Sequence, residues 1–189
     1  MKNKAEIRQE WLYWRDGLSL LERQRRSLQI RQTLLGLEKI RKARRVMLFA
    51  SMGSEVDTWG LAADLLQQDK QLFFPKTYWQ ERAIKAFAVQ NLTSDLRLGR
   101  FGVQEPSSDA VMCSPAELDV ILLPGLAFSK NGCRIGYGAG LYDRFLASSS
   151  SYHVAVSFFE QLLSQIPCEA HDVRYDVLVT DQGLYTPNT

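Results

Sequence analysis

The amino-acid sequence predicts an α/β protein, a single layered domain over residues 1–189 with a mostly parallel central sheet flanked by helices. Three observations support this fold class. Short continuous apolar runs, typical of strands buried on both faces, alternate with segments of helical periodicity. No repeat, linker or low-complexity tract interrupts the chain apart from a serine run at residues 148–151. With 46% hydrophobic residues, the chain can bury one substantial core.

The N-terminal region has the spacing of two amphipathic helices. A first helix is expected to end near Gly17, and its apolar stripe consists of Ile7, Trp11, Trp14 and Leu18. Ser19 and Glu22 form a capping-box pattern, which predicts a second helix from Ser19 to about Leu37. The apolar stripe expected on this second helix consists of Leu21, Leu28 and Leu35.

Residues 45–51, RVMLFAS, form the first predicted strand, and a helical pattern follows it through Leu61, Leu65 and Leu66. Either Asp57 or Thr58 can cap that helix. Ligands of open parallel sheets bind beyond the carboxyl ends of the strands, so Glu55 is a candidate substrate contact. The alternative for Glu55 is a solvated loop carboxylate.

The remaining elements continue the alternation of strands and helices. Further strands are predicted at residues 71–75, 83–89, 119–123, 153–158 and 176–180. Ser114 and Glu117, with a proline after the cap, predict a short helix before the strand at residues 119–123. A second short helical piece is expected at residues 161–165.

The most informative segment, residues 119–146, runs from an apolar strand through a glycine-rich loop into a predicted helix that starts at about residues 140–142. Five of the 12 glycines fall between Gly125 and Gly140. The alternating glycines at 136, 138 and 140 leave backbone N–H groups uncovered, and the helix start adds free donors and a positive dipole end. The segment therefore predicts a site for an anionic ligand.

Charged residues around these glycines narrow the prediction. Arg134 and Arg144 supply positive charge, and Asp143 can hold a divalent cation that bridges phosphate oxygens, which together indicate a nucleotide with magnesium. The alternative is a flexible surface turn in which Asp143 complements its own helix dipole. The spacing fits neither G-x-x-x-x-G-K-[ST] nor G-x-G-x-x-G, because Leu141 occupies the third glycine position of a motif starting at Gly136.

The cysteines and histidines exclude several other kinds of site. Cys113, Cys133 and Cys168 are widely spaced and form no C-x-x-C pair, so neither a disulfide framework nor a zinc site is indicated. We expect inert thiols, with a packing role for Cys133. Only His153 and His171 are present, too few for a histidine-rich metal centre.

No apolar run approaches the roughly 18 to 20 residues that span a bilayer. The N-terminus, MKNKAEIRQEW, lacks the apolar core of a signal peptide, and Glu6 and Glu10 argue against an organellar transit peptide. We therefore expect a soluble cytoplasmic protein without a membrane partner.

The net charge of +2 conceals an asymmetry. Residues 1–45 hold 13 Lys/Arg against 5 Asp/Glu, a balance of +8, and the remainder holds 10 against 16, a balance of −6. Nucleic acid is one possible partner for the basic segment, but its charges lie among regularly spaced apolar residues, so we do not expect this function. On this evidence Lys4 and Arg8, one helical turn apart, are typical exposed surface charges.

Taken together, several segments resemble the 5-formyltetrahydrofolate cyclo-ligase family, also called 5,10-methenyltetrahydrofolate synthetases. The likeness covers nearly the whole chain and is specific as an ordered set. It rests on Lys4 and Arg8, SMGSEVDT around Glu55, GVQEP at residues 102–106, LPGLAFSKNGCRIGYGAGLYDRFL at residues 123–146 and IPCEAHD ending at Asp172.

The resemblance implies a layered α/β fold and an ATP- and Mg²⁺-dependent enzyme that converts 5-formyltetrahydrofolate to 5,10-methenyltetrahydrofolate, releasing ADP and phosphate. It also implies roles by matching positions. ATP would be bound by Lys4, Arg8, Arg134, Ile135, Gly136, Tyr137, Gly138, Ala139, Gly140, Leu141 and Tyr142. Folate would face Ala50, Glu55, Tyr137, Gly138, Ala139, Gly140 and Leu141. Asp143 and Asp172 would hold Mg²⁺, and Arg134 and Tyr142 would be catalytic.

Two loop positions depart from the family pattern. Ala139 and Leu141 stand where a basic residue and a second tyrosine often occur, which affects the wall that would touch folate or phosphate. Leu141 can also pack inward. The alternative function is a non-catalytic folate- or nucleotide-binding module. We expect a monomer whose partner is a small-molecule substrate, 5-formyltetrahydrofolate, and not a nucleic acid.

Overall fold

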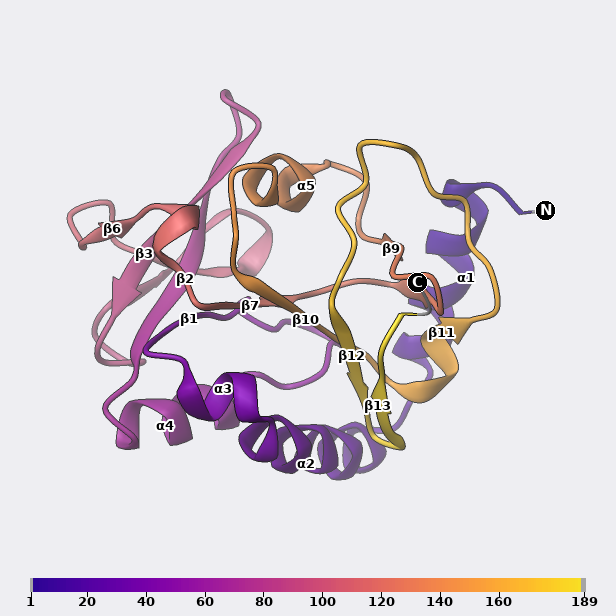
Figure 1. Ribbon diagram of the computed structural model, residues 1–189, viewed down its shortest axis with the longest axis horizontal. Helices are drawn as coiled ribbons and strands as arrows, with labels where there is room; N and C mark the ends of the chain where they lie inside the picture. The colour runs from indigo at the N-terminus through magenta and orange to yellow at the C-terminus, as the bar shows by residue number, and fades with distance from the viewer. Residues whose placement is uncertain (1, 188–189) are drawn as a thin grey trace.

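A computed structural model of the chain describes residues 2–187, and its centre is an eight-stranded sheet in the order β13-β12-β10-β7-β1-β2-β3-β6 (Figure 1). Its strands are β1 (Arg45–Met47), β2 (Gln71–Tyr78), β3 (Ala83–Val89), β6 (Met112–Cys113), β7 (Val120–Leu123), β10 (Tyr152–Val156), β12 (Val177–Thr180) and β13 (Gly183–Tyr185). The strands from β12 to β2 run parallel, and β13, β3 and β6 add antiparallel edges. The predicted mostly parallel sheet is confirmed.

Helices cover both faces of this sheet (Figure 1). They are α1 (Lys4–Asp16), α2 (Leu20–Gly36), α3 (Glu38–Lys42), α4 (Trp59–Gln67) and α5 (Leu141–Leu146), with 3₁₀ turns at Arg100–Gly102, Pro115–Glu117 and Phe159–Gln161. In the view of Figure 1, α2, α3 and α4 lie below the sheet and α5 lies above it. Residues of β7 and β12 are buried throughout, as expected for apolar strands covered on two sides.

The smaller elements lie beside the main sheet. A three-stranded sheet has the order β11-β8-β9, and a two-stranded sheet pairs β4 with β5. These strands are β4 (Leu96–Leu98), β5 (Gln104–Pro106), β8 (Ala127–Ser129), β9 (Arg134–Ile135) and β11 (Leu162–Leu163). In Figure 1, α1 lies next to β9 and β11 at the edge of the molecule where the N-terminus emerges.

Local capping explains why the helices begin where they do. Ser19 precedes α2 and its hydroxyl accepts a hydrogen bond from the Glu22 amide, as the sequence pattern predicts. Asp57, one of the two proposed caps, accepts from the first amides of α4, whereas Thr58 makes no side-chain cap. Asn3 and Glu6 form a reciprocal capping box at the start of α1, which was not predicted from the sequence.

The apolar stripe predicted for α2 is wrong at Leu21 and Leu28, whereas Leu35 is half-buried and packs against the main core. Leu21 and Leu28 are exposed by 77% and 49%, and α2 instead buries Arg26, Ser27, Ile30 and Leu34. Carboxylates from other parts of the chain surround Arg26, so this charged face can enter the interior and the leucines turn outward.

Two local predictions around the glycine-rich segment also need correction. The chain does not pass directly from β7 to the loop, because β8 and β9 form a hairpin between them. Residues 161–165 are not helical beyond Gln161, since Leu162 and Leu163 form β11 and pair with the edge of β8. A local hairpin decided the first case, and pairing between distant segments decided the second.

The expectation of three free thiols is wrong. Cys133, just before β9, forms a disulfide with Cys168, 35 residues later, and Cys113 is free and buried. The pairing depends on the approach of β9 to the loop that precedes β12, and nothing in the cysteine spacing indicates that approach.

Candidate functional site

The glycine loop connects β9 to α5 and takes a conformation that requires glycine. Gly138 and Gly140 have φ values of +101° and +63°, in the left-handed region. A Cβ atom at Gly138 would lie 3.3 Å from Cζ of Arg8, whereas one at Gly136 would meet nothing within 4 Å. The loop therefore keeps its backbone open next to a cation from α1.

One face of α1 reaches across to the loop and to the C-terminal part of the chain. Lys4 Nζ lies 2.7 Å from Oδ2 of Asp172 and 2.9 Å from Oε1 of Glu169. Arg8 Nε donates to the carbonyl of Gly136 at 2.8 Å. Both residues therefore make long-range contacts, and they are not the plain helix-surface charges that their spacing alone indicates.

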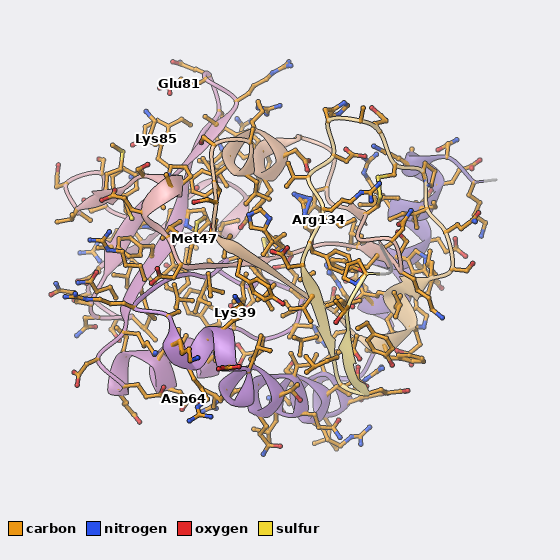
Figure 2. The ribbon with its side chains drawn as sticks, in the orientation of Figure 1. Lys39, Met47, Asp64, Glu81, Lys85 and Arg134 are labelled. Atoms are coloured by element: carbon orange, nitrogen blue, oxygen red, sulfur yellow. A yellow bond between two sulfur atoms is a disulfide. The ribbon has the colours of Figure 1, made fainter. Side chains whose placement is uncertain are left out.

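Arg134, at the start of β9, is a buried cation beside the loop, with 6% of its surface exposed. Its Nη2 and Nη1 atoms lie 3.0 and 3.3 Å from Oδ1 of Asp143. Burial lowers the pKa of Arg134, and Asp143 opposes this effect. Figure 2 labels Arg134 near α5, the helix that carries Asp143.

Two polar atoms, one on Arg134 and one on a neighbouring side chain, are buried without a partner among the described residues. They are Nε of Arg134 itself and the hydroxyl of Tyr142, whose ring lies 5.9 Å from the Arg134 guanidinium. Burial strongly raises the pKa of Tyr142, so its hydroxyl remains protonated. Buried donors without acceptors are costly, and a bound anion would satisfy both.

Asp143 and Asp172 are brought together by the segment before β12. The amide of Val173 donates to Oδ1 of Asp143 at 3.2 Å, and Val173 directly follows Asp172. Burial would raise the pKa of Asp172, but hydrogen bonds from Lys4 and from the Glu169 amide outweigh it and hold this pKa below its usual range. Residues 2–187 contain no cluster of three or more His, Cys, Asp or Glu side chains arranged to hold a metal. Protein carboxylates could thus supply only part of a coordination shell.

These groups surround a cavity of about 350 Å³. It is lined by Lys4, Arg8, Pro124, Arg134, Ile135, Gly136, Tyr137, Gly138, Ala139, Gly140, Leu141, Tyr142, Asp143, Glu169, His171 and Asp172. Every residue expected to bind ATP or Mg²⁺ is among them. The structure thus gathers these residues, from both ends of the chain, around one space within the range typical of small-ligand pockets.

Glu55 lies beyond the Tyr137 wall of this cavity. Its Oε1 accepts from the Tyr137 hydroxyl at 2.9 Å, and its Oε2 accepts from the Met52 amide at 3.0 Å. The Tyr137 hydroxyl in turn accepts from Nη2 of Arg15 at 2.6 Å. Burial raises the pKa of Glu55, and the charge of Arg15 is the main opposing influence. Burial and the neighbouring Glu55 raise the pKa of Tyr137 to about 12.

A second cavity of about 460 Å³ opens on the Glu55 side. It is lined by Leu20, Arg23, Gln24, Ser27, Leu28, Arg31, Gly53, Glu55 and Asp57. Ala50, the other residue expected to face the folate, lines neither of these two cavities and has only 6% of its surface exposed, within the main core. The two folate-facing expectations therefore differ in outcome, with Glu55 placed at a cavity and Ala50 buried behind it.

The two loop residues that depart from the family pattern have different surroundings. Ala139 is exposed, and its carbonyl accepts from Nη2 of Arg144 at 2.7 Å. Leu141 lines the cavity and also packs against the core cluster on the α5 side of the sheet. Nε of Arg144 also donates to the carbonyl of Arg82, so this arginine shapes the loop from outside the cavity.

Sequence reasoning missed three polar residues at the site. Glu169 and His171 line the cavity within the IPCEAHD segment, where only Asp172 was assigned. Arg15 was not singled out, although positions 4, 8 and 15 lie on one face of a helix, and this spacing is the signal that could have found it.

A model of the 5-formyltetrahydrofolate cyclo-ligase family matches residues 1–181. The chain belongs to this family. It is 30% identical to the 5-formyltetrahydrofolate cyclo-ligase of Mus musculus, over 95% of this chain and 92% of the mouse protein. It is 28% identical to that of Haemophilus influenzae, over 94% of this chain and 98% of that protein.

Among solved structures, the 5,10-methenyltetrahydrofolate synthetase of Aquifex aeolicus is similar, with a TM-score of 0.88 and 32% identity. The match covers 98% of this chain and 93% of the Aquifex chain. These matches confirm the family, the fold and the ligase class that the sequence resemblance implied. None of the helices within residues 2–187 has the length and apolar character needed to cross a membrane.

Proposed function

We propose that this cyclo-ligase family member converts 5-formyltetrahydrofolate to 5,10-methenyltetrahydrofolate at the expense of ATP, with Mg²⁺, releasing ADP and phosphate. The supporting observation is the cavity itself. It combines an open glycine backbone, three cations and three carboxylates, and it lies directly beside the Tyr137–Glu55 pair. An anion site and a site for a polar heterocycle thus share one wall.

The residues of the cavity fit a triphosphate. Lys4, Arg8 and Arg134 supply positive charge, and the loop from Gly136 to Gly140 offers backbone amides without side-chain cover. The unpartnered Nε of Arg134 and hydroxyl of Tyr142 are donors that phosphate oxygens would satisfy. In this proposal Arg134 and Tyr142 touch the reacting phosphate, and Ile135, Ala139 and Leu141 complete the wall.

Asp143 and Asp172 fit Mg²⁺ better than a metal that needs a complete protein cage. Mg²⁺ is usually bound by one or two carboxylates together with substrate phosphates and water. Bound there, it would neutralise charge between phosphate oxygens. Arg134 and Lys4, which now pair with these carboxylates, keep them oriented toward the cavity.

On the folate side, Glu55 and Tyr137 are the polar residues that would orient the pterin. A carboxylate can accept two hydrogen bonds from an aminopyrimidine edge, a role that needs acceptors and no proton transfer. Gly138 to Leu141 would face the same substrate from the loop. Ala50, being buried, would contribute only through the core that supports the Glu55 loop.

The proposed chemistry accounts for the residue types present. A formyl oxygen is a poor leaving group, so we propose that it attacks the γ-phosphate in line and displaces ADP. The substrate N10 then attacks the activated formyl carbon and gives up its proton to the departing phosphate, which carries the formyl oxygen away. Such a sequence depends mainly on positioning and charge stabilisation, which glycine amides and cations provide without a histidine base.

The proposed enzyme acts as a single-domain monomer in the cytoplasm. In the reducing cytoplasm the Cys133–Cys168 disulfide would be opened, so both redox forms belong in activity tests. Light scattering on the purified protein measures the mass, and a stable dimer would contradict the monomer.

A spectrophotometric assay tests the reaction directly. The methenyl product absorbs in the near ultraviolet, and we expect it to form from 5-formyltetrahydrofolate only when ATP and Mg²⁺ are both present. Wild-type protein that binds both substrates by calorimetry yet makes no product would contradict the proposal and favour the non-catalytic binding module.

An Asp143→Asn variant tests the metal side. The amide oxygen can keep the contacts with Arg134 and Val173, while the loss of charge should lower Mg²⁺-dependent turnover by about 100-fold. Asp109→Asn, in an exposed loop outside the cavity lining, is the matched control and should retain full turnover. Full activity of Asp143→Asn, with unchanged circular dichroism, would remove Asp143 from the site.

A further inference from the structure

Arg15 is a buried arginine whose partners are all uncharged. Only 3% of its surface is exposed, and its guanidinium donates to the Ser54 hydroxyl, the Gly125 carbonyl and the Tyr137 hydroxyl. It forms no ion pair with a described residue, although Ser54 donates onward to Asp16. A buried charge with neutral partners is costly, so stability alone explains this arginine poorly.

The hydrogen-bond directions around Tyr137 are determined by chemistry. A guanidinium can only donate, so the Tyr137 oxygen accepts from Arg15 at 2.6 Å. The single hydroxyl proton is then directed to Oε1 of Glu55, 2.9 Å away. The Met52 amide holds the other oxygen of Glu55, so the carboxylate is fixed from two sides.

Arg15 lies on the same face of α1 as Lys4 and Arg8. Arg8 binds the carbonyl of Gly136, and Arg15 binds the side chain of the next residue, Tyr137. One rigid helix thus holds consecutive residues of the glycine loop, one on the cavity side and one on the Glu55 side. Arg15 also donates to the Gly125 carbonyl, so the same helix contacts the chain just after β7.

We propose that Arg15 is a positioning residue for folate: through Tyr137 it holds the Glu55 carboxylate in the orientation that receives the polar edge of the substrate. This inference rests on the proposed function. Arg15 itself lines neither the 350 Å³ nor the 460 Å³ cavity, so it acts through its neighbours. Its loss should therefore weaken folate binding and leave ATP binding unchanged.

The test compares lysine substitutions at two equally buried arginines. Arg26, on α2, is also 3% exposed but touches neither Tyr137 nor Glu55. By calorimetry, Arg15→Lys should raise the Kd for 5-formyltetrahydrofolate about 10-fold, because an ammonium cannot match the forked geometry of the guanidinium. The Kd for ATP with Mg²⁺ should stay within about twofold, and Arg26→Lys should change neither.

A double-mutant cycle tests whether Arg15 acts on folate binding through Tyr137. Tyr137→Phe removes the hydroxyl between Arg15 and Glu55, so adding Arg15→Lys to it should weaken folate binding no further. Additive losses, an unchanged folate Kd in Arg15→Lys, or an equal rise of the ATP Kd would each overturn the inference. A wild type that binds folate without turnover, with Arg15→Lys binding it weakly, would contradict only the proposed reaction.

Discussion

Two arginines on neighbouring helices are equally buried but differently surrounded. Arg26 on α2 faces three carboxylates, with Nε 2.9 Å from Oδ2 of Asp181, a close pair with Glu160 and a longer contact with Glu22. Arg15 on α1 faces a hydroxyl, a carbonyl and a phenol. The difference separates a charge that the fold neutralises from one that it leaves available to a site.

The same contrast explains the charge asymmetry of the chain. Ion pairs such as Arg26–Asp181, Arg31–Asp64 and Arg45–Glu117 join the basic first segment to the acidic remainder. The structure therefore accounts for much of the basic segment without nucleic acid. Within the basic segment, Lys4 and Arg8 of α1 are the cations that line the cavity.

The largest expected effect comes from removing the charge of Arg26, the arginine that the fold neutralises. Arg26→Met should lower the free energy of unfolding by about 3–5 kcal/mol, because Asp181, whose side chain is 7% exposed, loses its buried partner. Urea unfolding measures this change. Arg25→Met, at an exposed neighbour, is the control and should lie within about 0.5 kcal/mol of wild type. A loss below about 1 kcal/mol in Arg26→Met would mean that Arg26 is not structural.

The next effect concerns the Cys133–Cys168 disulfide. It links segments next to the cavity covalently, whereas ion pairs hold Arg26 of α2. Cys168→Ser should lower the free energy of unfolding by about 2–4 kcal/mol, as expected for opening a loop of this length. Dithiothreitol should shift wild type by the same amount and leave the variant unchanged. Cys113→Ser, outside the pair, should keep its sensitivity to dithiothreitol. Equal unfolding curves for wild type with and without reductant would refute the link.

A smaller effect separates function from stability within the cavity. Tyr142→Phe removes a buried hydroxyl that has no partner within residues 2–187, so we expect unchanged or slightly higher stability. If that hydroxyl donates to phosphate, kcat/KM for ATP should fall about 10- to 100-fold. Steady-state kinetics measures this change, and Tyr13→Phe on the exposed side of α1 should behave as wild type. Unchanged kinetics would show that the hydroxyl is not used.

The smallest effect concerns a third buried basic group, His153, which the fold keeps neutral. Burial lowers its pKa and the charge of Arg134 acts in the same direction, while the Arg174 carbonyl and Asp176 oppose them. With a folded pKa below the unfolded value of about 6.5, His153 contributes stability at neutral pH that is lost as the pH falls through the folded pKa.

Urea unfolding of wild type and His153→Phe at pH 7, 6 and 5 tests this sign. Wild type should lose stability relative to the variant as the pH decreases. A relative gain would show that the folded protein holds His153 in its charged form.

The parts of the fold that depend on local chemistry could be predicted from sequence. The C-terminal end of α1, both ends of α2 and the buried strands follow from spacing and capping residues, which also limit the cap of α4 to Asp57 or Thr58. The disulfide, β11 and the outward leucines of α2 depend on distant partners, which one sequence does not show.

The candidate site divides in the same way. The glycine loop and Asp143 could be recognised from residues alone, because their chemistry is contiguous in the chain. Lys4, Arg8 and Asp172 required the family resemblance, since a lysine 168 residues from its aspartate partner shows no local pattern. The partners of Arg15 are a hydroxyl, a carbonyl and a phenol, which no charge pattern indicates, so its place on the Lys4 and Arg8 face of α1 was the only signal in the sequence.

The packing of α1 has a consequence for its motion. The first half of this helix rests on a small cluster of its own, in which Ile7 and Trp11 pack against β8, β9 and Ile166, apart from the main core. Trp14, in the second half, packs against the main core. Opening the small cluster exposes far less apolar surface than unfolding the sheet, so the first half of α1 can detach while β7 remains protected. Lys4 and Arg8 would leave together with it. Entry and exit of a large ligand can therefore proceed by subglobal opening, visible as faster amide exchange in α1 than in β7.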